Sequence, residues 1–552
     1  MKQHAAPGRR RIVTAITASI TAVAIVACLA LITAASTTSS LASTNSVANA
    51  GPAGDRALDI GPSGATPTPS DAPSEAPGTP SATPSAGSGS LADVKNVVLI
   101  LADDMDWALF DRIPRLTALQ AQGMTFTNHT VTDSLCCPSR TSILRSQYVH
   151  NHHVVSNSVD TGGGWPTFKK LGEERDCLPV WLQSAGVTTA LFGKYLNDYT
   201  IKYSDGRVPP GWNQWAVSMS GADSYRGYDY TLNENGTLHT YGHRPQDFLN
   251  DILTAKATQF ITTAPDHFFL ELASFNPHRP APVALKNKGT HLDEAAPRLP
   301  NYNAYGTNEP SWMRKVRVMG PRLRSEMDAL WRQRAQSAES VADSVSAVQA
   351  ALVASGRASD TMIIITADNG FHAGAHRMRG GKRTAFREDT VVPMIVIGPG
   401  VTPGSQFTDM TSTIDLAPTI DAVLGAQTPT WADGRSLQTI LTDGAAPADW
   451  RTAVLSESMG RSTPGDPDYQ ADAPPNFSAL RTPQWLYVVY RTGERELYNL
   501  AVDPYELNNI VTSADPGLVS ALNSQLQALR ACAGATCRTA DALPIPSTIP
   551  TN

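Results

Sequence analysis

Residues 96–104, NVVLILADD, run from a short apolar stretch directly into two adjacent aspartates. The apolar part does not alternate with polar residues, so it predicts a strand buried on both faces, as in the centre of an α/β sheet. Four further runs have this character, at residues 188–192, 268–273, 362–366 and 392–397. Helical patterns lie between them, at residues 113–122, 178–184, 248–263 and 323–355. This alternation predicts a layered α/β domain over residues 94–446.

The pattern changes after residue 447, where the predicted strands become shorter. They lie at residues 453–457, 485–490 and 496–499, and a helical pattern follows at residues 516–529. We therefore expect a smaller α+β subdomain over residues 447–540, followed by a flexible tail over residues 541–552.

The N-terminal region has the pattern of an export segment. Arg9, Arg10 and Arg11 precede an apolar run that extends to about residue 35. Three fates stay open: cleavage after the A-x-A site at residues 48–50, retention as a signal-anchor, or lipidation at Cys28. Residues 1–50 are assigned to this segment, and the Gly/Pro/Ala/Ser/Thr-rich residues 51–93 to a disordered linker. We expect a secreted or cell-surface protein, which meets a membrane only through an uncleaved N-terminal segment.

Composition excludes some classes of protein. The 552 residues contain 44 Lys and Arg against 50 Asp and Glu, a net charge of −6. A dedicated nucleic-acid-binding protein would show a basic excess, so no nucleic-acid partner is expected. Six cysteines are too few for a disulfide scaffold. Cys532 and Cys537 are close in an exported chain, and this predicts a local disulfide bond.

Two of the predicted strands end in oxygen-bearing side chains. Asp103 and Asp104 follow the first strand, and Asp368 and Asn369 follow the strand at residues 362–366. Each pair alone is compatible with an ordinary turn or helix cap. Ligands in open α/β sheets bind beyond the carboxyl ends of the strands. Together the four side chains therefore predict a site for a hard cation, Ca²⁺ or Mg²⁺ rather than Zn²⁺.

A third chemical segment is LCCPSRTS, residues 135–142. It places Cys136 near the start of a predicted helix with Arg140 four residues on, a setting that lowers the pKa of a thiol. The alternative is a buried cysteine on a turn. A soft thiolate is an unusual neighbour for a hard cation, so the residues alone leave the role of Cys136 open.

Residues 136–140, CCPSR, resemble the C-x-P-S-R signature of the formylglycine-dependent sulfatases. They are joined by Asp103-Asp104 before them and by the DNG of residues 368–370 and the GKRTAF of residues 381–386 after them, in the order typical of that family. The resemblance extends from about residue 94 to residue 538. It is closest to the N-acetylglucosamine-6-sulfatases and related heparan-type glycan sulfatases. It implies an alkaline-phosphatase-like fold, a layered α/β domain with a central, mostly parallel sheet.

The same resemblance implies a modified nucleophile and a bound metal. A formylglycine-generating enzyme would oxidise Cys136 to formylglycine (3-oxoalanine), whose hydrate attacks sulfur and later releases sulfate. The metal is expected to be Ca²⁺, with Mg²⁺ as the alternative, and its ligands would be Cys136, Asp103, Asp104, Asp368 and Asn369.

Further roles follow from the resemblance. Arg140 would hold the formylglycine hydrate, and Lys194 and Lys382 would bind the sulfate oxygens. His278 would protonate the leaving oxygen. Substrate contacts are expected from three residues: His152, Asn197 and Arg279.

One position departs from the family pattern. Many sulfatases carry a histidine shortly after the lysine that corresponds to Lys194, whereas Leu196 and Asn197 follow here. Asn197 can take part of that role but cannot carry a proton at neutral pH.

The expected activity is hydrolysis of sulfate esters on sulfated sugars, with aryl sulfates as further substrates. The alternatives are an arylsulfatase, a phosphonate or phosphodiester hydrolase of the same superfamily, and a non-catalytic surface protein that binds glycans.

Overall fold

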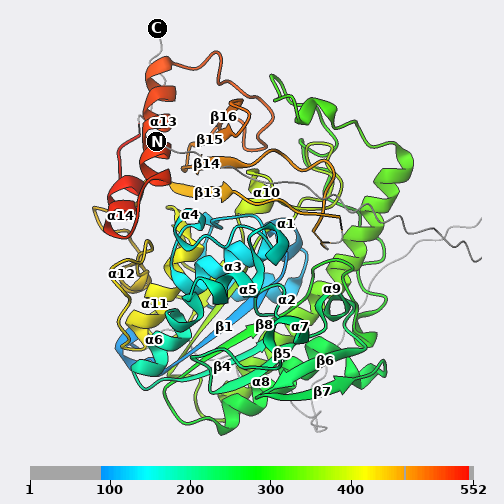
Figure 1. Cartoon of the computed structure of the whole chain (residues 1–552), viewed down its shortest axis with the longest axis vertical. Coiled ribbons are helices and arrows are strands. Elements are labelled where there is room, and N and C mark those ends of the chain that lie inside the picture. The colour runs from blue at the N-terminus through cyan, green and yellow to red at the C-terminus, as the bar shows by residue number, and fades with distance from the viewer. Residues whose placement is uncertain (1–88, 465, 467, 546–552) are drawn as a thin grey trace, which may run out of the picture. The chain divides into compact units, whose positions relative to one another are not determined.

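The computed structural model describes residues 89–464, 466 and 468–545. Its largest element is a ten-stranded sheet in the order β11-β2-β10-β9-β1-β8-β4-β5-β6-β7 (Figure 1). The strands of this sheet are β1 Asn96–Ala102, β2 Met124–Phe126, β4 Thr188–Gly193, β5 Gln214–Ser218, β6 Tyr230–Glu234, β7 Thr237–Tyr241, β8 Phe268–Ala273, β9 Thr361–Ala367, β10 Met394–Ile397 and β11 Gln406–Phe407. A two-stranded sheet pairs β3 His129–Thr130 with β12 Thr411–Ser412.

Strand β1 lies between β9 and β8 and is parallel to both. Strands β8, β4 and β5 continue the parallel run, whereas β10 is antiparallel to β9. The prediction of a mostly parallel α/β sheet is therefore confirmed. The register pairs Ala102 with Ala367 and Leu101 with Ala273. The loops that follow β1, β8 and β9 consequently leave the sheet at one edge.

Helices cover both faces of the large sheet. Val97, Leu99 and Leu101 of β1 belong to a buried cluster that includes residues of α6 and α11. Val98 and Ile100 belong to a second cluster with α8 and α9. Strand side chains alternate between faces, so β1 is apolar throughout because both faces are covered. The helices are α1 Trp107–Phe110, α2 Pro114–Thr117, α3 Cys136–Arg145, α4 Val149–His152, α5 Gly164–Lys170, α6 Leu178–Ser184, α7 Ile201–Ser204, α8 Leu249–Thr263, α9 Pro321–Ala354, α10 Arg387–Thr390, α11 Leu416–Val423, α12 Gln438–Asp443, α13 Pro516–Arg530 and α14 Ala535–Asp541.

Two predicted elements differ from the structure. The helix expected at residues 113–122 is shorter, because α2 ends at Thr117 and a 3-10 helix, Ala118–Ala121, follows. The strand expected from residue 392 begins at Met394, after Pro393. Strand β10 pairs with neighbours on both sides, and proline has no N–H to donate to such a ladder.

The C-terminal part forms a four-stranded antiparallel sheet, and Figure 1 shows it beside α13. Its strands are β13 Val454–Ser458, β14 Phe477–Arg481, β15 Trp485–Tyr490 and β16 Arg495–Asn499. The sequence pattern does not predict β14. Tyr148 and Ile414 of the larger part pack in the core of this sheet and α13. The subdomain therefore shares its core with the rest of the fold.

The structure moves two of the predicted boundaries. Leu91, placed in the linker of residues 51–93, is only 4% exposed and precedes β1 in a short 3-10 helix. Asp541, placed in the tail, is buried and accepts a hydrogen bond from Arg451 Nε at 3.1 Å. The predicted signal or anchor segment, the rest of the linker and residues 546–552 lie outside the described residues. Within the described part, none of the helices has the length and apolar character needed to span a membrane.

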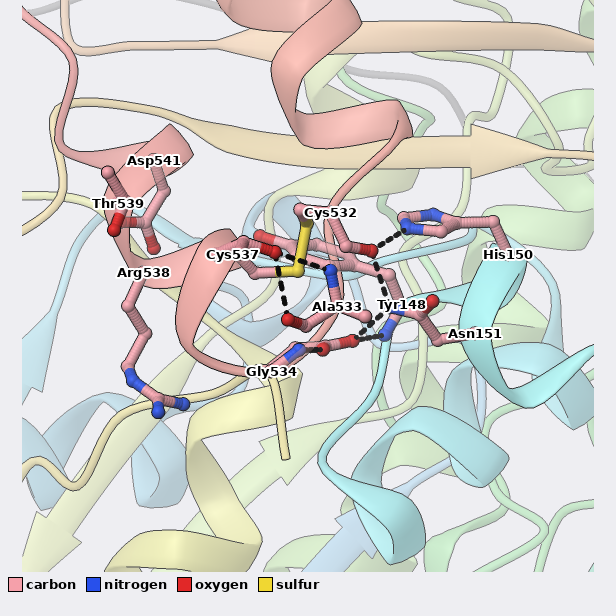
Figure 2. The surroundings of a disulfide bond; sticks show 12 residues. Tyr148, His150, Asn151, Cys532, Ala533, Gly534, Cys537, Arg538, Thr539 and Asp541 are labelled. Carbon is pink, nitrogen blue, oxygen red and sulfur yellow. Dashed lines mark hydrogen bonds between the residues drawn. A yellow bond between two sulfur atoms is a disulfide. The ribbon is translucent and has the colours of Figure 1, made fainter. Parts of the chain in front are cut away.

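The predicted disulfide bond between Cys532 and Cys537 is present. Figure 2 shows the carbonyl of Cys532 facing the side chains of His150 and Asn151. His150 Nε2 and Asn151 Nδ2 lie 3.0 and 3.1 Å from that oxygen. The short loop closed by the disulfide is thereby attached to α4 of the larger part.

Candidate active site

The four oxygen-bearing residues predicted as a cation site lie together. Asp103 and Asp104 follow β1, Asp368 and Asn369 follow β9, and the last residues of these two strands pair. The backbone N–H of Asp104 donates to Asp368 Oδ1 at 3.2 Å, and Asn369 Nδ2 donates to Asp104 Oδ1 at 2.6 Å. All four side chains are buried. The parallel register therefore converts two distant segments into one cluster of oxygen atoms.

Helix α3 brings Cys136 to the same cluster. Cys136 is the first residue of the helix and is fully buried. Its Sγ lies 3.5 Å from Asp103 Oδ1, and Ser139 Oγ donates to the carbonyl of Asp368 at 2.5 Å. The helix start is thus attached to the end of β9.

Arg140, one turn further along α3, neutralises part of the acidic cluster. Its Nε donates to Asp368 Oδ2 at 2.7 Å, and its Nη1 donates to the carbonyl of Lys194 at 2.9 Å. Burial would raise the pKa of the Asp368 carboxyl, but Arg140 and Lys194 outweigh that effect and lower the pKa to about 2. Asp368 is therefore ionised at neutral pH.

Lys194 enters the site directly after β4. Its Nζ lies 2.5 Å from Asp103 Oδ2. The preceding Gly193 has a φ of +127°, and a Cβ there would lie 1.8 Å from the carbonyl oxygen of Ala273. Only glycine allows this close approach of β4 to β8, and the approach sets where Lys194 leaves the sheet.

Lys382 lies between the acidic cluster and the cysteine. Its Nζ is 2.6 Å from Asp104 Oδ1 and 2.7 Å from Cys136 Sγ. Like Lys194, it is buried and its pKa is raised: burial would lower the pKa, but the neighbouring carboxylates outweigh it. Both lysines are therefore cations. Lys194 contacts Asp103, and Lys382 contacts Asp104 and the Sγ of Cys136.

The cluster has the chemistry of a divalent-metal site. Asp103, Asp104, Cys136 and His278 each place a ligand atom within 4.8 Å of the others. Asp104 Oδ2 and Asn369 Oδ1 are buried without a hydrogen-bond partner among the described residues. Unpartnered buried oxygens are costly. A cation bound between them would satisfy both, so the residues fit a hard divalent ion.

His278 reaches the cluster from the loop after β8. Its Nδ1 is 2.5 Å from the carbonyl of Arg279, and its Nε2 is 2.9 Å from Asp468 Oδ1. Both ring nitrogens face acceptors, an arrangement that a ring with hydrogen on both nitrogens satisfies. Burial would lower the pKa of His278, but Asp104 and Asp468 outweigh it and the pKa is raised.

Asp468 is a residue of this cluster that sequence analysis missed. It is buried, and its Oδ2 accepts from Asn157 Nδ2 at 2.9 Å and lies 3.6 Å from Cys136 Sγ. It follows no predicted strand and belongs to no motif, and it is 332 residues from Cys136 in the chain. No local signal could have placed it here.

Comparison with known proteins identifies the family. The family description Sulfatase matches residues 95–426, more than half of the chain. The chain belongs to the sulfatase family. The description N-sulphoglucosamine sulphohydrolase, C-terminal, matches residues 374–532. An N-acetylglucosamine-6-sulfatase from Capra hircus is 35% identical over 480 residues, which cover 80% of this chain and 85% of that protein. The protein is therefore a sulfuric ester hydrolase by family.

Two solved structures share the fold of this sulfatase. One is a complex with its substrate D-glucosamine-2-N,6-O-disulfate, at a TM-score of 0.68 and 20% identity, covering 81% of this chain and 99% of that one. The other is a phosphonate monoester hydrolase from Silicibacter pomeroyi, at a TM-score of 0.59 and 25% identity, covering 78% and 94%. They support the alkaline-phosphatase-like architecture.

The predicted substrate contacts of the sulfatase are only partly brought to the site. His152 is buried elsewhere: its Nε2 lies 3.0 Å from Ser142 Oγ and its Nδ1 accepts from the N–H of Val154 at 3.1 Å. Both ring nitrogens of His152 make hydrogen bonds within the fold, so a substrate contact from His152 is not supported. Arg279 adjoins His278, but its Nη1 donates to the carbonyl of Gly380 at 2.9 Å.

A cavity of about 370 Å³ opens beside Lys194. Asn197 lines it, as does Tyr225, whose ring centroid lies 4.3 Å from that of His278. The remaining walls include three carboxylate side chains, those of Asp160, Asp198 and Asp466. The cavity therefore adjoins the cluster at Lys194 and has an acidic, partly aromatic wall.

Proposed function

We propose that this sulfatase removes 6-O-sulfate from glucosamine residues, with N-acetylglucosamine-6-sulfate as its substrate type. The observation that carries the proposal is the buried cluster in which Cys136 Sγ contacts Lys382 and Asp103. The relative that is 35% identical over most of both chains supports the substrate class.

Cys136 is proposed to be converted to formylglycine. Contrary to the lowered pKa expected from the helix start and Arg140, burial and the Asp103 carboxylate raise the pKa of the Cys136 thiol well above the ordinary value, so an unmodified Cys136 is a neutral, weak nucleophile. The Sγ atom here stands in for a hydrate oxygen, and the hydrated aldehyde would supply the hydroxyl that attacks sulfur. The partner required is a formylglycine-generating enzyme. It must act before the fold closes, because Cys136 is fully buried.

Asp103, Asp104, Asp368 and Asn369 are proposed to hold the metal together with residue 136. Their donors are all hard oxygens, which favours Ca²⁺, with Mg²⁺ as the alternative. The bound ion would supply positive charge that favours the ionised form of the attacking hydroxyl.

The remaining catalytic work falls to cations of the chain. Lys194 and Lys382 are placed to neutralise charge on the sulfate oxygens, which grows in the transition state. Arg140 is proposed to hold the formylglycine hydrate, and it also contacts Asp368 and the carbonyl of Lys194. His278, protonated on both nitrogens, is placed to donate its Nε2 proton to the leaving sugar oxygen.

The cavity beside Lys194 is the proposed sugar site. Asn197 and Tyr225 offer hydrogen-bonding and stacking surfaces for a pyranose. Three carboxylates in its walls, against one lysine, favour a neutral or cationic substituent over a second sulfate.

The proposed location is outside the cytoplasm. The N-terminal basic and apolar pattern and the Cys532–Cys537 disulfide bond support export, because disulfides persist in oxidising compartments.

The test is sulfate release from N-acetylglucosamine-6-sulfate by enzyme coproduced with a formylglycine-generating enzyme and supplied with Ca²⁺. We expect turnover that is lost in Cys136→Ala, and a peptide covering residues 131–140 whose mass shows the aldehyde. The second candidate is phosphonate monoester hydrolysis, which the shared fold with the Silicibacter enzyme favours. Faster turnover of a phosphonate monoester than of the sugar sulfate would overturn the proposal in favour of that candidate.

A further inference from the structure

The carboxylate of Asp468 lies where a reacting sulfate group would have to lie. Its Oδ1 is 2.9 Å from His278 Nε2 and 3.1 Å from Lys382 Nζ. Its Oδ2 is 2.9 Å from Asn157 Nδ2 and 3.6 Å from Cys136 Sγ. A proton donor, a cation and the nucleophilic position therefore surround one anionic group of the chain itself.

A sulfate ester poised for attack needs the same place. Reacting atoms in a near-attack geometry are about 3–3.5 Å apart, close to the distance between Cys136 Sγ and Asp468 Oδ2. The sulfate oxygens would also need Lys382, and the leaving oxygen would need His278. Two anions cannot share these partners at van der Waals distance. Binding of a sulfate group therefore requires the Asp468 side chain to leave.

We infer that Asp468 is an internal competitor for the sulfate position: its carboxylate excludes small free anions and displaces product sulfate after each turnover. This inference rests on the proposed function. A sulfated sugar also gains contacts in the cavity beside Lys194, so it can displace the carboxylate. Free sulfate lacks those contacts and competes poorly.

The segment around Asp468 is hydrogen-bonded to the loop that carries Lys382 and Arg383. These bonds keep the Asp468 carboxylate near Cys136. With its side-chain amide assigned in the orientation that satisfies both groups, Gln470 accepts from the N–H of Lys382 at 2.7 Å and donates to the carbonyl of Lys382 at 3.2 Å. Arg383 donates to Ser462 and, at 3.2 Å, to the carbonyl of Gly460. A group tethered in this way acts at a high effective concentration.

The contact between Asp468 and His278 also permits a different role. Asp468 could act through His278 as a positioning residue, holding the imidazolium ready to protonate the leaving oxygen. The two roles predict opposite kinetics. Loss of a competitor tightens anion binding and leaves chemistry intact, whereas loss of a positioning group slows chemistry and leaves anion binding unchanged.

The experiment compares Asp468→Asn with the parent enzyme, both modified and loaded with Ca²⁺. With N-acetylglucosamine-6-sulfate as substrate, we expect the inhibition constant for inorganic sulfate to fall at least fivefold and KM to fall with it, while kcat changes less than threefold. Asp472→Asn is the matched control, because Asp472 is an exposed carboxylate on the same segment. It should leave all three constants unchanged.

A binding measurement separates failure of this inference from failure of the proposed function. Inorganic sulfate is titrated calorimetrically into Cys136→Ala and into the double variant with Asp468→Asn, neither of which turns over substrate. Tighter sulfate binding by the double variant supports the inference even if glucosamine sulfates prove not to be substrates. Unchanged or weaker sulfate binding overturns it, as does a kcat at least tenfold lower in Asp468→Asn with an unchanged inhibition constant. Asp468→Ala repeats the test should the asparagine variant fail to fold.

Discussion

Arg140 Nε lies 2.7 Å from Asp368 Oδ2, in an ion pair whose side chains are 3% and 0% exposed. The pair connects helix α3, which carries Cys136, to the end of strand β9. Because the ion pair is buried, we expect it to matter both to stability and to the placement of Cys136.

We predict that Arg140→Ala destabilises the fold by about 3–5 kcal/mol, since it removes the nearest cation from the buried Asp368 carboxylate and leaves only Lys194, 4.0 Å away, paired with it. Sulfatase activity should be lost as well. Denaturant unfolding of the two proteins measures the difference. Arg322→Ala is the control, because Arg322 pairs with Glu326 on an exposed face of α9, and it should unfold like the parent. Equal unfolding of Arg140→Ala and the control would contradict the structural role of the pair.

Metal removal should abolish activity and lower the melting temperature. Without a cation, Asp104 Oδ2 and Asn369 Oδ1 have no hydrogen-bond partner among the described residues, and the acidic groups repel one another. Chelation followed by readdition of Ca²⁺ or Mg²⁺ tests this by calorimetry and by sulfate release. Asn369→Ala should reduce the rise in melting temperature on Ca²⁺ addition. An unchanged melting temperature and full activity after chelation would refute a metal site.

The carboxyl of Glu496 should make the folded protein less stable as the pH rises. Burial raises the pKa of its carboxyl to about 7, even though Tyr490 and Tyr498 donate to it at 2.6 and 2.8 Å. The folded state therefore binds a proton that the unfolded chain has released above its pKa of 4.5. The stabilising contribution is complete below pH 4.5 and is lost as pH rises through about 7.

Glu496→Gln should accordingly reduce the loss of unfolding free energy between pH 4.5 and about pH 7 by at most about 3 kcal/mol. Urea unfolding at intervals from pH 5 to pH 8 measures it. Glu326→Gln changes an exposed residue of α9 and should leave the slope unchanged. An identical slope in parent and Glu496→Gln would show that Glu496 titrates normally.

The acidic cavity predicts discrimination among sugars. We expect kcat/KM for D-glucosamine-2-N,6-O-disulfate to be at least tenfold lower than for N-acetylglucosamine-6-sulfate, because Asp160, Asp198 and Asp466 repel a second sulfate. Asp160→Asn should reduce the ratio of the two kcat/KM values. Asp223 is exposed, and Asp223→Asn should leave this ratio unchanged. Equal kcat/KM for the two sugars would place the amino substituent outside this cavity.

Sequence alone indicated most residues of the candidate site because each follows a local pattern. Asp103 and Asp368 come after apolar strands, and Cys136 belongs to a long signature. That these strands lie in a mostly parallel sheet covered on both faces could be expected from their apolar character. Asp468 could not be found in this way, since its position depends on packing between segments hundreds of residues apart. His152 was expected to contact the substrate from the family resemblance, but its ring nitrogens bond to Ser142 and Val154 instead.

The amino-acid sequence by itself determined the α/β class, the sulfatase resemblance, the Cys532–Cys537 bond and the identity of the oxygen donors, because hydrophobic pattern and short motifs are local properties. Only the tertiary structure decided which charges meet. Contacts between distant segments set three relationships. These are the register of β1 and β9, the close approach of β4 to β8 at Gly193, and the position of Asp468 next to Cys136. Electrostatic energy depends on distances in space, and those distances exist only once the chain has folded.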